Sequence, residues 1–61
     1  MDISELPQDS AILMSYINTL LRDRYDSLAQ LCDDMDIDIT ALTAKMKDAG
    51  FEYNSELNKF W

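Results

Sequence analysis

The stretch SLAQLCDDMDIDITALTAKMKDAGFEY, residues 27–53, decides the fold. Its first residue, Ser27, precedes apolar residues at helical spacing, and Gln30 follows three positions later. A serine and a glutamine at this spacing are typical of a capping box, in which each side chain bonds a free amide at a helix start. We therefore expect a helix over about residues 27–35.

A second helix is expected after an acidic turn. Asp38 is placed to accept hydrogen bonds from the free amides of a helix start, and Gly50 can adopt the positive φ that often ends one. These signals predict a helix over about residues 38–49. Its inner face is expected to hold Leu42, Met46 and Ala49. Ile37, within the turn, is expected to fill the core between the two helices.

An earlier helix is predicted over about residues 10–23, with Asp9 as its N-cap. Its apolar residues recur at three- and four-residue spacing, which indicates one buried face. That face holds Leu13, Tyr16, Ile17, Leu20 and Leu21. Ile12 lies off this stripe, so we expect it to be exposed or to meet a partner. Residues 1–8 are expected to form a loose lead-in.

The last segment, residues 51–61, is predicted to form a β-hairpin, because aromatic strand formers flank a polar loop. Asn58 lies near the end of that loop and tolerates left-handed φ. Phe60 and Trp61 are neighbours, so they point to opposite faces of a strand. If Phe60 is inside, Trp61 is outside, where it either anchors an interface or lies flat over the first helix.

Together these elements form a single small domain, residues 1–61. The predicted fold class is mainly α (α+β): a three-helix, helix-turn-helix-like domain with a C-terminal β-hairpin, similar to a miniature winged helix. A chain of 61 residues buries a small core. Its stability must therefore come from packing, and a partner chain is one source of further stabilisation.

The composition excludes several kinds of site. One cysteine, Cys32, and no histidine leave no intramolecular disulfide and no Cys/His zinc site. Asp34, Asp36 and Asp38 begin like a calcium loop, but isoleucine and lysine replace the glycine and the final glutamate that such a loop needs. Because no histidine can activate Cys32, we expect no enzyme activity, and we expect no metal or cofactor.

The charge balance bears on the partner. The chain carries 12 acidic and 5 basic residues, a net charge of −7, which repels DNA, RNA and acidic lipid surfaces at long range. Asp33 and Asp34 lie at the unfavourable end of their helix, where they serve solubility or a basic partner.

The sequence has no leader pattern and no membrane-spanning run, and its lone cysteine suits a reducing compartment. We therefore expect a cytoplasmic protein.

Six short segments are the most specific in the chain: Leu6-Pro7, Ser15-Tyr16-Ile17-Asn18, Leu21-Arg22-Asp23, Ser27-Leu28, Leu31-Cys32 and Asn58-Lys59-Phe60. Together they resemble domain-of-unknown-function family 4250, a small bacterial family. The resemblance extends from Leu6 to Phe60 and implies a compact helical protein with a C-terminal hairpin. It brings no activity, ligand or catalytic residue to this chain. Ser10 stands where many members have proline, which affects only the start of the first helix.

The sequence favours a small cytoplasmic protein-interaction module, with a homodimer as one form of it. The missing catalytic groups, the acidic surface and a surplus of apolar residues all motivate this interpretation. The surplus apolar residues are Ile3, Ile12, Leu57 and Trp61. Of these, Ile12, Leu57 and Trp61 are the predicted partner-binding residues.

Two alternatives remain open. The first is a DNA-binding winged helix-turn-helix, and it ranks second because DNA-binding proteins gather several basic side chains on one face. Its contacts would come from the third helix (Thr40, Thr43 and Lys47), the hairpin as a wing (Lys59) and two backbone-contacting arginines (Arg22 and Arg24). The second alternative is an acidic mimic of nucleic acid that occupies a basic protein, which requires carboxylates clustered on one face.

Overall fold

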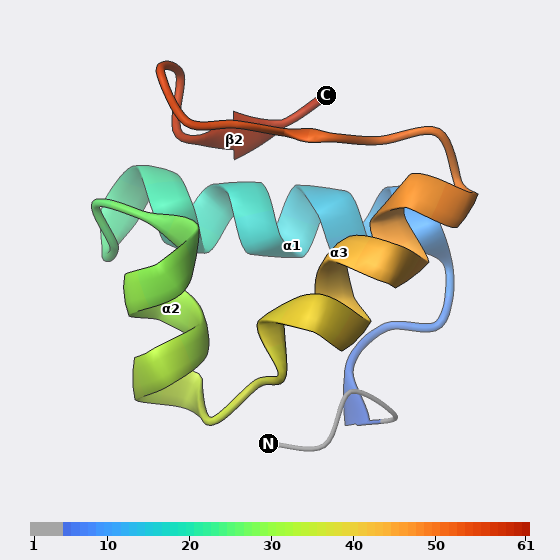
Figure 1. The fold of residues 1–61 in the computed structure, drawn as a ribbon, viewed down its shortest axis with the longest axis horizontal. Helices are drawn as coiled ribbons and strands as arrows, with labels where there is room; N and C mark the ends of the chain where they lie inside the picture. Colours follow the sequence, from blue (N-terminus) through green and yellow to red (C-terminus); the bar gives the residue numbers. More distant parts are fainter. Residues whose placement is uncertain (1–4) are drawn as a thin grey trace.

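The computed structural model describes residues 5–61 and contains three helices and a two-stranded antiparallel hairpin (Figure 1). The elements are α1 (Ser10–Asp23), α2 (Leu28–Met35), α3 (Ile39–Asp48), β1 (Tyr53–Asn54) and β2 (Lys59–Phe60). In Figure 1, α1 runs across the middle of the molecule, α2 lies below its left end, α3 rises on the right to the level of α1, and the hairpin runs along the upper edge. The predicted class, a mainly helical α+β domain, is confirmed. Ile3 lies outside the described residues.

All three predicted N-caps are confirmed. The carboxylates of Asp9 and Asp38 and the hydroxyl of Ser27 each accept hydrogen bonds from backbone amides two or three residues further on. The capping box differs in one detail. The Gln30 side chain reaches back to the backbone N–H of Asp26, at 2.8 Å, one residue earlier than expected. This bond ties the loop before α2 to the first turn of that helix.

Residues in the left-handed backbone conformation follow the ends of α2 and α3 and lie in the hairpin loop. Asp36 closes α2 at φ 54°, Gly50 follows α3 at φ 88°, and Asn58 lies at φ 53° in the hairpin loop. Aspartate, asparagine and glycine are the residues that tolerate this region best. The positive φ at Gly50 and at Asn58 therefore matches the prediction, whereas the turn at Asp36 was not predicted.

The core joins all three helices to the hairpin. It consists of Leu6, Leu13, Ile17, Leu21, Leu28, Leu31, Cys32, Ile37, Leu42, Met46 and Phe60. Ile37 fills the space between α2 and α3, as predicted. Ala49 was predicted to be buried and is exposed, because α3 ends at Asp48 and Ala49 turns away as its C-cap. The predicted buried stripe of α1 is also too wide, since Tyr16 remains 38% exposed.

One asparagine side chain attaches the hairpin to α1. The Phe60 N–H donates to Oδ1 of Asn18 at 2.8 Å, and Nδ2 of Asn18 donates to the Phe60 carbonyl at 3.0 Å. Phe60 pairs with Tyr53 in the strand register, and their rings pack with centroids 5.6 Å apart. Asn18 therefore completes the hydrogen bonding on the free edge of β2 and holds the Phe60 ring in the core.

A second asparagine joins the hairpin to both ends of the α1–α2 loop. Nδ2 of Asn58 donates to the carbonyls of Leu21 and Tyr25, at 3.1 and 2.9 Å, which caps the C-terminal end of α1. Its Oδ1 accepts from the Tyr53 hydroxyl at 2.6 Å. That hydroxyl in turn accepts from the N–H of Leu28 at 3.2 Å, at the start of α2. The hairpin thus fixes the spacing between α1 and α2.

The variant Asn18→Ala is expected to lower the free energy of unfolding by about 1–3 kcal/mol, because the N–H and carbonyl of Phe60 lose their partners in a half-buried place. The measurement is the midpoint of urea denaturation followed by far-UV circular dichroism. The control is Ser55→Ala, the same kind of truncation at an exposed hairpin position, with an expected change within about 0.5 kcal/mol. Equal midpoints for both variants would show that hairpin docking does not depend on Asn18.

Candidate functional site

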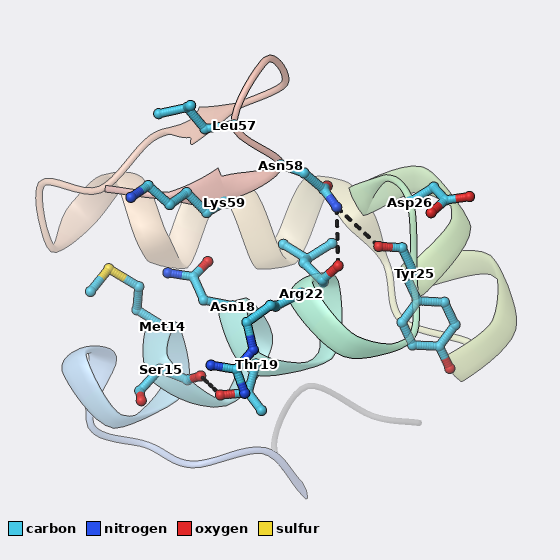
Figure 2. A pocket seen from close by; sticks show the side chains of 11 residues that line it. Met14, Ser15, Asn18, Thr19, Arg22, Tyr25, Asp26, Leu57, Asn58 and Lys59 are labelled. Atoms are coloured by element: carbon cyan, nitrogen blue, oxygen red, sulfur yellow. Dashed lines mark hydrogen bonds between the residues drawn. The ribbon is translucent and has the colours of Figure 1, made fainter.

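A groove lies between α1 and the hairpin loop (Figure 2). Its volume is about 630 Å³. The lining side chains come from α1 and from both connecting loops: Met14, Ser15, Asn18, Thr19, Leu21, Arg22, Tyr25, Asp26, Leu57, Asn58 and Lys59. The same asparagines that attach the hairpin, Asn18 and Asn58, therefore also line the groove.

A second, shallower depression of about 490 Å³ lies on the outer face of α1. Its lining is apolar or small: Ala11, Ile12, Ser15, Tyr16 and Thr19. Ser15 and Thr19 line both depressions, so the two form one continuous surface. We call the two depressions together the α1–hairpin surface.

The three predicted partner-binding residues lie in or beside the α1–hairpin surface. Ile12 is 60% exposed and lines the outer depression, and Leu57 is 53% exposed and lines the groove. Trp61 is 62% exposed and lines neither, but Lys59, which lines the groove, holds its ammonium 5.7 Å from the centre of the Trp61 ring. Phe60 is buried, so Trp61 points outward as the alternation predicted.

Charged side chains on this surface are few: Arg22, Asp26 and Lys59, all of which line the groove. From Ser10 to Leu21 the sequence holds no charged side chain, its longest such stretch. At the C-terminal end of that stretch, the Arg22 guanidinium makes two hydrogen bonds to the Asp23 carboxylate, at 2.9 and 3.1 Å. This bonding lowers the pKa of Asp23 and raises that of Arg22. Arg22 therefore forms a surface ion pair and adds little net charge.

Several carboxylates have structural roles. The Tyr25 hydroxyl donates to the Asp34 carboxylate at 2.5 Å and ties the α1–α2 loop to α2. The bond to Asp34 raises the pKa of Tyr25 above its ordinary value, because ionisation would place two negative charges together. Sequence analysis gave Asp34 no role in the fold. Asp9 and Asp38 act as helix caps and Asp23 forms an ion pair, so these carboxylates too have partners within the domain.

The residues predicted for DNA contact are divided between elements. Arg22 and Lys59 line the groove together. Thr40, Thr43 and Lys47 belong to α3, which lies behind α1 and the hairpin in the view of Figure 2. The Thr43 hydroxyl is already bonded to the carbonyls of Ile39 and Thr40. Arg24 lies against the Tyr25 ring, with its guanidinium carbon 6.0 Å from the ring centre.

The remaining chemistry is limited. Cys32 is buried, and burial raises the pKa of its thiol, so the thiolate that a nucleophile requires is disfavoured. Within residues 5–61 no three potential metal ligands among His, Cys, Asp and Glu come together. Across the same residues, no helix has the length and apolar character needed to cross a bilayer.

Sequence analysis missed the roles of Asn18 and Asn58 and the surface formed by Ser15 and Thr19. One available signal was Asn18 itself, a polar amide that lies directly beside the buried Ile17 in the middle of the first helix. Another was that the segments carrying the family resemblance, Ser15–Asn18 and Asn58–Phe60, contain both sides of the contact between α1 and the hairpin.

The Tyr25–Asp34 bond gives a pH-dependent prediction. Because the pKa of Tyr25 is raised above 10.0, the bond stabilises the fold below about pH 10 and is lost as pH rises through the folded-state pKa. In Asp34→Asn we expect the ionisation of Tyr25, followed by carbon NMR of labelled tyrosine, to move to lower pH. Asp33→Asn makes the same charge change without touching the bond and should leave the midpoint in place. A shift of equal size in both variants would contradict the assignment.

Comparison with known proteins identifies one family. Residues 7–60 match the family model described as Domain of unknown function (DUF4250). No curated protein and no solved structure matches the chain. Since the match covers nearly the whole sequence and agrees with the earlier resemblance, the chain belongs to the DUF4250 family.

Proposed function

We propose that this domain is a cytoplasmic protein-interaction module that acts by binding and not by catalysis, and that the α1–hairpin surface is its contact site. The observation that carries the proposal is the joining of two depressions through Ser15 and Thr19. This places the exposed apolar side chains Ile12 and Leu57 on one continuous surface, with Trp61 beside it.

The composition of this surface supports protein binding. Protein interfaces have an apolar centre, depleted of charge, and a polar rim. Here the uncharged face of α1 supplies the centre, and Arg22, Asp26 and Lys59 supply a rim along the groove. Tryptophan, tyrosine and arginine are enriched among the residues that carry most of the binding energy near the centre of an interface.

Two features weigh against the DNA-binding alternative. First, β2 packs along α1, whereas a wing contacts DNA beside the recognition helix, here α3. Second, the few basic side chains are divided between the groove and α3. The acidic-mimic alternative loses support as well, because several of its carboxylates are occupied by caps, an ion pair and the bond to Tyr25.

Site-specific photo-crosslinking in cells tests the proposed function. A benzophenone amino acid is introduced at the position of Ile12 or Leu57, both more than half exposed, so folding should not suffer. We expect discrete adducts from both positions. The matched control is the position of Ala44, an exposed residue of α3, which should give none. Adducts from Ala44 alone, or the same pattern at all three positions, would contradict the proposal.

A titration of labelled DNA with the protein distinguishes the proposed function from the DNA-binding alternative. With a labelled random duplex at low salt, we expect no rise in fluorescence anisotropy, because a net charge of −7 repels phosphates when screening is weak. Binding that weakens steeply with added salt would instead show that the basic residues contact phosphates together. That result would favour the DNA-binding alternative.

A further inference from the structure

We propose that the outer depression of the α1–hairpin surface is a self-association site, through which two copies of this domain pack α1 against α1 in antiparallel orientation. The inference rests on the proposed function and names its partner as a second copy. Ile12, Ser15, Tyr16 and Thr19 fall within about 100° of arc around the helix and form the face.

Charge is the first argument for a second copy. Each chain carries a net charge of −7, so two copies that meet through acidic surfaces repel each other. No charged side chain lines the outer depression of α1, and Asp23, which falls on the same side of the helix one turn beyond Thr19, is paired with Arg22, so that end of the helix is locally neutral. A basic partner would gain most from the acidic surfaces and nothing from this face. An uncharged face on an acidic chain is therefore electrostatically suited to its own copy.

The shape of the face is the second argument, because the face complements itself. Ile12 protrudes, and the small residues Ser15 and Thr19 leave a hollow along the same side of the helix. With a two-fold axis between Ser15 and Tyr16, Ile12 of each copy lies opposite Thr19 of the other. This reciprocal contact is what a two-fold interface requires. Small residues at four-residue spacing also allow helix axes to approach to about 8–10 Å.

One hydroxyl of this face is already hydrogen-bonded within its own helix. The Thr19 hydroxyl already donates to the Ser15 carbonyl of its own helix, at 2.8 Å, so its proton remains bonded when a second copy covers it. The exposed apolar side chains are Ile12, at 60%, and Tyr16, at 38%. Burying these side chains removes apolar area from water, which favours association.

The available area sets the expected strength. A helix of 14 residues is about 21 Å long, and one such face buries less than the roughly 1,200 Å² in total that stable complexes need. The dimer is therefore weak and is expected to form only at high protein concentration. The dimer also has an unusual salt dependence. Added salt screens the repulsion between the two acidic chains and therefore strengthens their association.

Sedimentation equilibrium of the whole chain tests this proposal at concentrations up to about 1 mM, in low and in high salt. We expect the average mass to rise from one chain toward two with concentration, and the dissociation constant to fall about threefold or more in high salt. Ile12→Asp should keep the mass at one chain throughout. Ile39→Asp is the matched control: the same substitution, with the same added charge, at an isoleucine of α3 that is 41% exposed, should dimerise as the parent does.

Three results would overturn the proposal: one-chain mass at every concentration and salt, equal weakening by both substitutions, or association that weakens as salt rises. These results are distinguishable from failure of the proposed function. Crosslinks from the Ile12 position to a different protein, combined with a one-chain mass, would retain the interaction module and reject self-association. Circular dichroism of both variants verifies that each is folded.

Discussion

The bond pair between Asn18 and the backbone of Phe60 is the constraint on which the remaining structure depends. Strands of two residues cannot hold a hairpin in place by themselves. Asn18 supplies the missing hydrogen bonds, and its reach from α1 fixes the distance between hairpin and helix. The Phe60 ring is thereby held in the core between the helices. Asn58 adds a second attachment at the far end of α1, so the hairpin cannot pivot.

This attachment also determines which part of α1 remains available. The hairpin covers one flank of the helix, and the core covers the side that faces α2 and α3. The remaining strip is the uncharged outer face, bounded by the groove that the hairpin creates. Fold and candidate site therefore have a common origin: the amide that docks the hairpin also lines the groove.

Local features of the fold were predictable and distant ones were not. The caps at Asp9 and Asp38 and the left-handed Asn58 depend on a few neighbouring residues, so the sequence contains the relevant information. The contact between Asn18 and Phe60 joins residues 42 positions apart, and its existence depends on how the hairpin lies in space. The exposure of Ile12 and Trp61 was inferred from helical spacing and strand alternation, and Leu57 was chosen as a surplus apolar residue. Their gathering around one surface required the tertiary arrangement.

The outward position of Trp61 has a practical consequence for spectroscopy. It is the single tryptophan of the chain, and its ring lies mostly in solvent beside the Lys59 ammonium. Its fluorescence therefore reports on the surface and not on the core, and unfolding changes its surroundings little. A molecule that covers the end of the hairpin, in contrast, would transfer the indole from water to a less polar environment and shift its emission to the blue. The fluorescence of Trp61 should therefore respond to binding at the end of the hairpin and change little when the protein unfolds.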